Sequence, residues 1–218
     1  MLTIILIAAT ALISIAAFNN QALLNNYLFY PPAVKKGQWY RLITYGFLHA
    51  DYMHLIFNMF TLYFFGMDIE KVCKEALGNV GGSVCYLLLY FSALVVSILP
   101  SYFKHKDNEN YRSLGASGAV SAVIFAYVLV NPMNFMGIMF IPVWLPAFLF
   151  GIIFILISTH LGRKQSKGIN HTAHVAGALY GVIFMVVAFF AMAQINLLEH
   201  FVNQIHVSSV RDIIRFGI

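Results

Sequence analysis

Long apolar runs, separated by short joints rich in charged and turn residues, constrain this chain more than any other feature of its sequence. A membrane-spanning helix needs about 20 mainly apolar residues. Six segments approach that length, at residues 2–24, 49–69, 82–103, 115–130, 144–160 and 171–194. Hydrophobic residues make up 61% of the 218 residues and charged residues only 10%, unlike a soluble domain. We therefore predict an all-α polytopic membrane protein with six transmembrane helices.

The six segments form one predicted membrane domain, residues 1–196, followed by a tail at residues 197–218. Apolar and polar residues alternate in the tail at helical spacing, so we expect either an amphipathic helix at the membrane interface or a disordered tail. The first segment lacks the basic start of a secretory signal and is expected to be retained. The net charge is +5, but the basic residues lie in short loops, which argues against nucleic acid as a partner.

The fourth segment begins at GASG, residues 115–118, and is short for a spanning helix. The helix from Ser117 to Val130 would measure about 21 Å, whereas the hydrocarbon core is about 30 Å thick. The glycine-rich stretch before Ser117 then lies at membrane depth, where irregular backbone is tolerated only if it is buried in protein or faces a water-filled cavity. The sequence therefore predicts a wet pocket inside the bilayer with Ser117 on its wall.

Polar side chains gather at one end of three helices that alternation makes parallel, the second, fourth and sixth. They are His49, His54 and Asn58 on the second, Ser117 on the fourth, and His171 and His174 on the sixth. Polar residues inside a membrane are costly and usually functional. His54 and Asn58 are four residues apart and share a helix face, which His49 need not join.

Small residues recur every four positions on the fourth and sixth helices. They are Gly118, Ala122 and Ala126 on one, and Ala173, Gly177 and Gly181 on the other. Such faces let two membrane helices approach closely, so we assign Gly177 and Gly181 to packing. Docking these faces is predicted to bring Ser117 and His174 within hydrogen-bond reach.

These polar residues supply the parts needed for acyl transfer. A serine hydroxyl becomes a nucleophile when a neighbouring base takes its proton, and a histidine such as His174 has a suitable unperturbed pKa. His54, Asn58 and the backbone amide of Ser117 at a helix start can donate hydrogen bonds to an oxyanion. Asp51 is the only carboxylate near that level, so the base is expected to act without an acidic partner.

The chain resembles the rhomboid intramembrane serine proteases. The resemblance rests on WYRLITYGFLHADYMHLIFNM at residues 39–59, GASG at the fourth helix and AHVAGALYG at the sixth, and it covers about residues 1–195. It implies a rhomboid-like six-helix bundle and a catalytic dyad of Ser117 and His174. It also implies oxyanion stabilisation by His54, Asn58 and the Ser117 amide.

The resemblance assigns further residues to structural support. Gly115 would let the chain pass close to the site, and Trp39 and Arg41 match a Trp-Arg element in a loop lying partly in the membrane, although Tyr40 separates them here. Some bacterial members carry an aromatic residue four positions after the nucleophile, where it stacks on the histidine. This chain has Ser121 there, so that orienting contact is either missing or supplied elsewhere.

The substrates that the resemblance implies are membrane-anchored proteins, cut within or near their spanning segments. They would enter from the lipid beside the fifth helix and the loop after it, residues 162–168. No cofactor and no metal are implied, and the oligomeric state is not indicated. The expected location is a bacterial inner membrane, as an integral protein with its active site toward the outside.

Loop charges conflict with that orientation. The end that carries the active site would hold nine basic residues: Lys35, Lys36, Arg41, Lys104, Lys106, Arg112, Arg163, Lys164 and Lys167. The other end would hold four: Lys71, Lys74, Arg211 and Arg215. The positive-inside rule would place the first end in the cytoplasm; we follow the family orientation.

Three other functions compete with a protease. A catalytically inactive rhomboid-like protein would bind membrane clients, but it would usually lack the serine or the histidine. A membrane metalloenzyme would use the histidines of HADYMH and HTAH as ligands, although four histidines are few for the diiron boxes they resemble. A transporter is disfavoured because the sequence shows neither an internal repeat nor charge at the membrane midplane.

Overall fold

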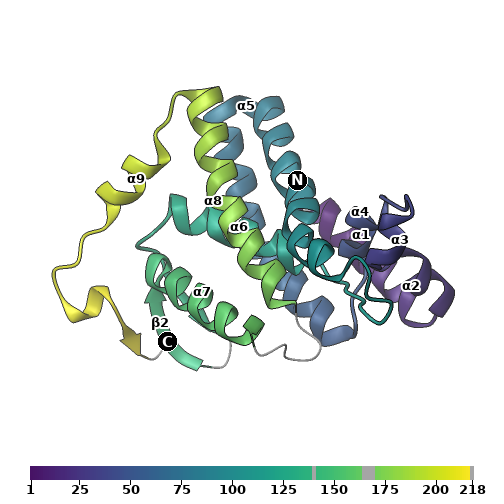
Figure 1. Cartoon of the computed structure of the whole chain (residues 1–218). Coiled ribbons are helices and arrows are strands. Elements are labelled where there is room, and N and C mark those ends of the chain that lie inside the picture. The colour runs from purple at the N-terminus through teal and green to yellow at the C-terminus, as the bar shows by residue number, and fades with distance from the viewer. Residues whose placement is uncertain (139–140, 164–169, 217–218) are drawn as a thin grey trace.

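The computed structural model describes residues 1–138, 141–163 and 170–216, and helices dominate it (Figure 1). The helices are α1 Leu2–Phe18, α2 Gln21–Tyr27, α3 Pro31–Lys35, α4 Arg41–Thr44, α5 Tyr52–His105, α6 Ser117–Val130, α7 Ala147–Arg163, α8 His171–Ala193 and α9 Leu197–Gln204. Two 3₁₀ turns, η1 Tyr45–Phe47 and η2 Val210–Asp212, complete the helical part.

Helix α5 contains both the second and the third predicted segments. Gly78 has φ +75° and ψ 168°, which breaks the helical path between them and which glycine tolerates best. The two limbs then pack together: a Cβ added at Gly82 would overlap the backbone of Cys73, and one added at Gly66 would lie 2.7 Å from the hydroxyl of Tyr86. The predicted joint between these segments is therefore the break at Gly78, where two packed helices meet.

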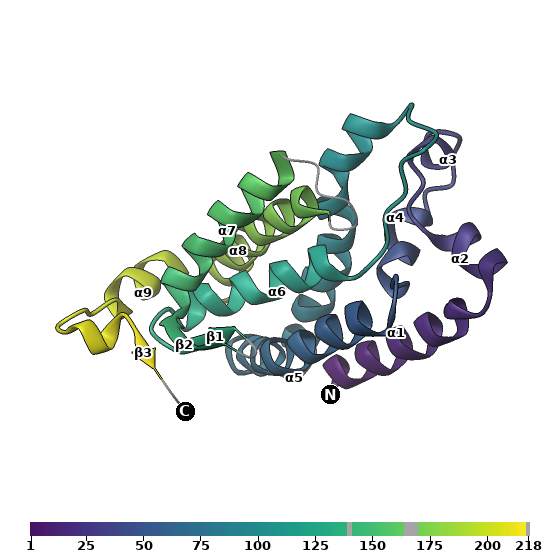
Figure 2. The same ribbon diagram turned by 90° about the horizontal axis from the view of Figure 1, so that it is seen from below.

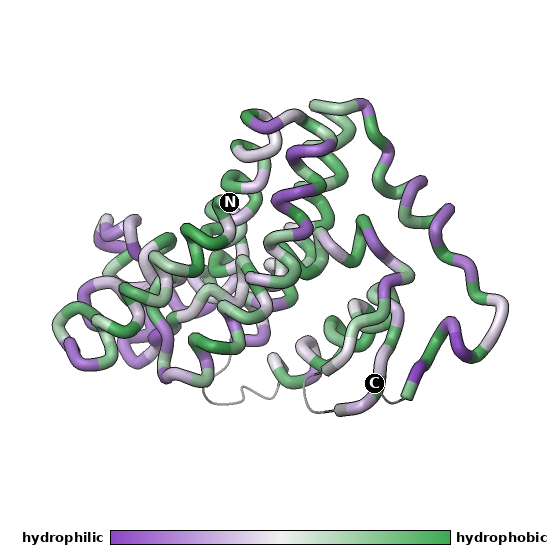
Figure 3. The backbone as a smooth tube through the Cα atoms, turned by 180° about the vertical axis from the view of Figure 1, so that it is seen from behind, coloured by the Kyte–Doolittle hydropathy of each residue, from purple (hydrophilic) through white to green (hydrophobic). Residues whose placement is uncertain are grey.

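By length and composition, α5 and α8 are the described helices that can cross a membrane. Helices α1 and α6 are apolar but shorter, as is the stretch Ala147–Gly162 of α7. Six spans therefore remain a prediction. Figure 3 shows the hydrophobic colouring following the long helices, while hydrophilic segments lie at their ends, in loops and in the tail.

Helix α6 occupies the centre of the bundle, and all its residues from Gly118 to Leu129 are buried. It packs against α5 and α8, while α1 lies on α5 and α7 lies on α8. Figure 2 shows α1 to α4 on one side of this centre and α7 to α9 on the other. A short, fully enclosed central helix explains why its sequence is apolar all round.

A small antiparallel sheet corrects the all-α prediction. It contains β1 Phe135–Ile138, β2 Ile141–Pro146 and β3 Arg215–Phe216, in the order β1-β2-β3. We expected the fifth helix to begin at residue 144, but α7 begins at Ala147. Proline lacks an amide hydrogen and disfavours helix at the residue before it, so Pro142 and Pro146 keep this apolar stretch extended.

The chain ends also differ from the predicted boundaries. Helix α1 stops at Phe18 rather than at residue 24, because Asn20 caps a separate helix α2 by accepting a hydrogen bond from the Leu23 amide at 3.0 Å. The tail is ordered through Phe216: α9 packs on α6 and α8, and β3 pairs with β2. The tail thus contains a short helix, α9, and its place at the membrane interface stays a prediction.

Candidate active site

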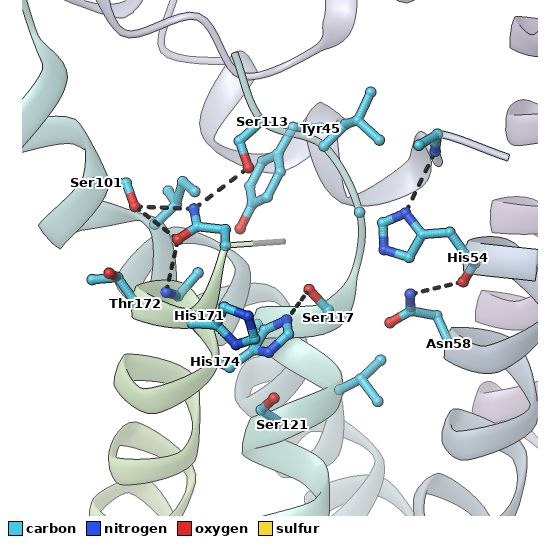
Figure 4. Close-up of a pocket in the computed structure, with 18 of the residues that line it drawn as sticks. Tyr45, His54, Asn58, Ser101, Ser113, Ser117, Ser121, His171, Thr172 and His174 are labelled. Carbon is cyan, nitrogen blue, oxygen red and sulfur yellow. Dashed lines mark hydrogen bonds between the residues drawn. The ribbon is translucent and has the colours of Figure 1, made fainter. Parts of the chain in front are cut away.

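Ser117 and His174 lie side by side at the starts of two packed helices (Figure 4). Ser117 is the first residue of α6, and His174 lies in the first turn of α8. His174 Nε2 is 2.8 Å from Ser117 Oγ, a normal hydrogen-bond length. The predicted approach of these two side chains is therefore present in the structure.

The small residues of α6 and α8 account for this approach. A Cβ added at Gly177 would overlap the carbonyl group of Gly118, and one added at Gly181 would overlap that of Ala122. The two backbones therefore touch where these glycines lie, as the small-residue faces predicted. Because helices are stiff, this contact sets the depth and separation of Ser117 and His174.

The loop that delivers Ser117 is tied down by backbone hydrogen bonds. Phe29 and Ser113 exchange two of them, at 2.9 and 3.1 Å, and the Gly115 amide donates to the Tyr45 carbonyl at 3.0 Å. Gly115 has φ +115°, a conformation that favours glycine, and a Cβ there would lie 2.7 Å from His54 Cε1. Gly115 therefore permits the close passage of the chain that was predicted.

His54 and Asn58 stand on α5, across Ser117 from His174 (Figure 4). Asn58 Nδ2 donates to the His54 carbonyl at 2.9 Å, and His54 Nδ1 accepts from the Ala50 amide at 3.4 Å. If Nδ1 accepts, Nε2 carries the hydrogen of the neutral ring. This Nε2 faces Gly115, since a Cβ there would lie 2.9 Å from it. His54 thus offers a donor beside the nucleophile, and Asn58 has a second amide hydrogen.

His49 has a structural position that sequence reasoning missed. It is 1% exposed, and its Nδ1 is 2.9 Å from Ser14 Oγ, which itself donates to the Phe47 carbonyl at 2.8 Å. Ser14 Oγ therefore accepts from Nδ1–H, which leaves Nε2 to accept from the Ala116 amide at 3.5 Å. His49 thus connects α1 to the residue before Ser117, and its ring lies 4.9 Å from that of His54.

Asn170 is a second residue that the prediction omitted. Its Oδ1 accepts from the Ala173 amide at 3.1 Å, which caps α8 one turn before His174. Its Nδ2 donates to Ser101 Oγ at 3.0 Å and to the Tyr111 hydroxyl at 3.1 Å. Asn170 therefore fastens the start of α8 to the end of α5. An asparagine just before an apolar helix is a recognisable N-cap signal.

An aromatic side chain lies beside the His174 imidazole even though Ser121 stands where some family members carry an aromatic residue. Ser121 is buried on α6, one turn below Ser117 (Figure 4). The aromatic ring near the imidazole comes instead from Phe154 of α7, with ring centroids 6.2 Å apart and planes 27° apart. His171 contacts the imidazole edge to face, at 5.7 Å and 76°. The aromatic ring beside the imidazole therefore comes from α7 and not from α6.

Arg41 anchors the loop before α5. It is 6% exposed, and it donates to the carbonyls of Asn25 at 2.9 Å and Leu28 at 2.7 Å and to Gln38 Oε1 at 2.6 Å. Trp39 is 60% exposed and lies on the surface of the same loop. Arg41 therefore ties this loop to the chain around α2, whereas no side-chain hydrogen bond of Trp39 is found among the described residues.

A cavity of about 1080 Å³ adjoins the two candidate catalytic residues. Its lining includes His54, Asn58, Ser117, Phe154 and His174. Helix α7 packs against α8 and α6 but scarcely touches α5 in the part of the chain that is described. The predicted entry route also involves the loop of residues 162–168. Residues 164–168, which include Lys164 and Lys167, lie outside the described residues.

The histidines do not form a recognisable metal centre. Within residues 1–138, 141–163 and 170–216, no three His, Cys, Asp or Glu side chains gather where they could hold an ion. Zinc sites usually take three or four such ligands. The metalloenzyme alternative therefore gains no support from the donor set.

Comparison with known proteins agrees with the motifs. A rhomboid domain matches residues 36–191. RHOMBOID-like protein 12, mitochondrial, of Arabidopsis thaliana is 33% identical over 174 residues, which cover 76% of this chain and 51% of that protein. The putative rhomboid protease YdcA of Bacillus subtilis is 29% identical over 101 residues, 46% of each chain. The presenilin-associated rhomboid-like protein, mitochondrial, of Bos taurus is 29% identical over 141 residues, 64% of this chain and 35% of that protein.

The chain spans about half the length, or less, of these curated relatives. Two of the three carry mitochondrial names, so the comparisons do not support the bacterial inner membrane that we expected. The match extends from the loop that holds Arg41 to nearly the end of α8 and includes Ser117 and His174. This chain belongs to the rhomboid family of membrane-embedded proteins.

Proposed function

We propose that this chain is an intramembrane serine endopeptidase that cleaves membrane-anchored proteins within or near their spanning segments. The observation that carries the proposal is the 2.8 Å hydrogen bond between Ser117 Oγ and His174 Nε2, beside a cavity of about 1080 Å³. A serine paired with a base is the arrangement that nucleophilic catalysis requires. The family membership adds support, since one relative is named a putative rhomboid protease.

In the proposed reaction, Ser117 Oγ attacks the carbonyl carbon of the scissile peptide while His174 Nε2 takes the hydroxyl proton. The tetrahedral oxyanion then collapses, the peptide C–N bond breaks, and His174 returns the proton to the leaving amine. Water, deprotonated by the same histidine, then attacks the acyl carbon; the bond from that carbon to Ser117 Oγ breaks, and His174 returns the proton to Oγ. Neither step requires a carboxylate, which suits a site where two side chains form the catalytic pair.

The oxyanion would lie between Ser117 and the α5 wall. The Ser117 amide is at the first position of α6, where a backbone N–H has no acceptor within the helix. His54 Nε2 lies near Gly115, and His54 and Asn58 both line the cavity from α5; a turn of the Asn58 amide would aim its free N–H at the oxyanion. Donors placed where charge develops stabilise the transition state more than the bound substrate.

The proposal includes six spans, formed by α1, the two limbs of α5, α6, α7 and α8. Both termini then lie on the membrane face opposite the active site: Met1 lies beside Glu70, far along α5 from His54, and α8 runs away from His174. Substrate would enter between α5 and α7. A topology reporter fused to the C-terminus tests this arrangement. A reporter signal from the same side of the membrane as the active site would contradict it.

A fluorophosphonate probe tests the chemistry directly. Purified wild-type protein should be labelled at Ser117; labelling should vanish in Ser117→Ala and fall steeply in His174→Ala, because the hydroxyl then lacks its base. Ser113→Ala removes a serine of the preceding loop and should label as the wild type does. Labelling should also slow as the pH falls and His174 becomes protonated, because imidazolium cannot accept a proton.

The inactive client-binding alternative predicts the opposite result. Folded wild-type protein would then remain unlabelled while a serine hydrolase in the same detergent reacts. Cleavage of a single-spanning reporter protein, abolished by Ser117→Ala, separates a protease from a protein that only binds such helices.

A further inference from the structure

The imidazole of His174 has little hydrogen bonding to hold its orientation. Its Nε2 meets Ser117 Oγ at 2.8 Å, and no side chain or backbone group among the described residues bonds its Nδ1. A base that is held at one nitrogen can rotate about its side-chain torsion, and this rotation would carry Nε2 away from the hydroxyl. The orientation must therefore depend on packing against the ring.

We propose that Phe154 is a positioning residue for His174: its ring covers one face of the imidazole and keeps Nε2 aimed at Ser117. This inference rests on the proposed protease function. The ring centroids are 6.2 Å apart and the planes 27° apart, within the range of offset aromatic stacking. His171 touches the same imidazole edge to face at 5.7 Å. The two neighbouring rings together restrict rotation of the imidazole.

Phe154 is itself held by contacts between α7 and α6. Its ring lies 5.6 Å from that of Phe125, at 56°. One turn earlier, Gly151 approaches the same helix: a Cβ there would lie 3.4 Å from Val128 Cγ1 and 3.5 Å from Phe125 Cε1. These are ordinary van der Waals distances, looser than the backbone contact between α6 and α8. The alignment of the base therefore depends on where α7 lies, and α7 borders the cavity.

The test replaces the ring without removing its bulk. Phe154→Leu and Phe154→Met should lower the rate of Ser117 labelling by a small fluorophosphonate about three- to tenfold, the loss expected for one aromatic pair. Phe154→Tyr should restore most of that rate. The matched control is Phe150→Leu, the same change one turn earlier on α7, at a residue that packs on the core and does not line the cavity; it should label at the wild-type rate.

A small probe reaches Ser117 without the entry of a substrate helix. A slower reaction with it therefore indicates a less effective base rather than reduced substrate access. With a helical substrate, the Phe154 variants should lower kcat more than they raise KM. A structural role alone would lower the thermal unfolding midpoint and leave the labelling rate of folded protein unchanged. Phe154→Met is included so that one variant without an aromatic ring can still be tested if the Phe154→Leu protein does not fold.

Labelling of Phe154→Leu or Phe154→Met at the wild-type rate would overturn the positioning role and leave the protease function standing, since Ser117 would still react. Equal loss in Phe150→Leu would also overturn it, because the effect would then belong to α7 as a whole. Wild-type protein that does not label removes the protease function, and the role of Phe154 with it.

Discussion

The two walls of the cavity are built in different ways. On one wall α6 and α8 touch backbone to backbone, where a Cβ at Gly177 or Gly181 would overlap a carbonyl group of α6. On the other wall α7 rests on α6 through side chains and scarcely touches α5 in the described part of the chain. Ser117 and His174 are joined across the first wall, whereas Asn58, His54 and Phe154 reach the site from the second.

This difference separates two requirements of the proposed reaction. Proton transfer needs two side chains held within a few tenths of an ångström, and close-packed helices provide that rigidity. Entry of a substrate helix would need a wall that can part, and α5 and α7 scarcely touch in the described part of the chain. Variants of the packed wall should therefore affect folding, and variants of the open wall should affect turnover.

Asn58→Ala should give the largest effect among the variants that leave Ser117 and His174 in place. Asn58 lies on the wall formed by α5 and α7 and is proposed to donate a hydrogen bond to the oxyanion. Removal of one oxyanion donor costs about 10²–10³ in rate. Because His54 and the Ser117 amide would share this role, we expect a loss near the lower value. Steady-state cleavage of a membrane-anchored reporter should show kcat reduced and KM nearly unchanged. A folded variant that turns over at the wild-type rate would make Asn58 a tie between turns of α5, through its bond to the His54 carbonyl.

Gly177→Ala and Gly151→Ala compare the two walls with the same substitution. The added methyl at Gly177 would overlap the Gly118 carbonyl, whereas at Gly151 it would meet side chains at 3.4 Å or more. Overpacking costs about 1–3 kcal/mol, while glycine to alanine in an open helical position gains up to about 1 kcal/mol. Thermal unfolding in detergent should show a lower midpoint for Gly177→Ala only. Equal midpoints would mean that the α6–α8 contact is less tight than the structure indicates.

Asn170→Ala tests whether the start of α8 positions the base. Loss of an N-cap costs about 1 kcal/mol, and this one also ties α8 to Ser101 and Tyr111. Asn196→Ala is the matched control, because it removes a comparable cap, the 3.2 Å bond to the Glu199 amide, from α9. Both variants should lose stability, but only Asn170→Ala should slow Ser117 labelling. If labelling slows in both or in neither, the Asn170 cap has no specific effect on His174.

Lys35→Ala should have the smallest effect, because it lies on neither wall. Lys35 Nζ is 2.5 Å from Asp107 Oδ1, and both side chains are more than half exposed. Their hydrogen bond raises the pKa of Lys35 and lowers the pKa of Asp107. The contribution of Asp107 to the free energy of unfolding is thus fully present above pH 3.8, its ordinary pKa, and is lost as the pH falls through its lowered pKa. The contribution of Lys35 is lost at alkaline pH, as the pH rises through its raised pKa.

Exposed ion pairs contribute little to stability, so the unfolding midpoint of Lys35→Ala at neutral pH should match that of the wild type. A clear decrease in the midpoint would show that the contact between the end of α3 and the loop after α5 stabilises the fold, although it belongs to neither wall.

The sequence by itself determined the helical membrane class, the faces of small residues and the pairing of Ser117 with His174. These features are local: apolar length predicts a helix in lipid, and residues every four positions share one face. Backbone contact between Gly177 and Gly118 follows once two such faces exist. The proline-bounded strand β2 was also readable in principle, because proline acts on its immediate neighbours.

Only the tertiary structure decided which other residues surround the site. His49 reaches Ser14 and Ala116, Asn170 reaches Ser101, and Phe154 reaches His174. Each contact joins residues that are far apart along the chain, and none is required by the pattern of its own helix. Their positions follow from how the helices tilt and rotate against one another. Packing of the whole bundle sets those angles, and no local pattern in the sequence records them.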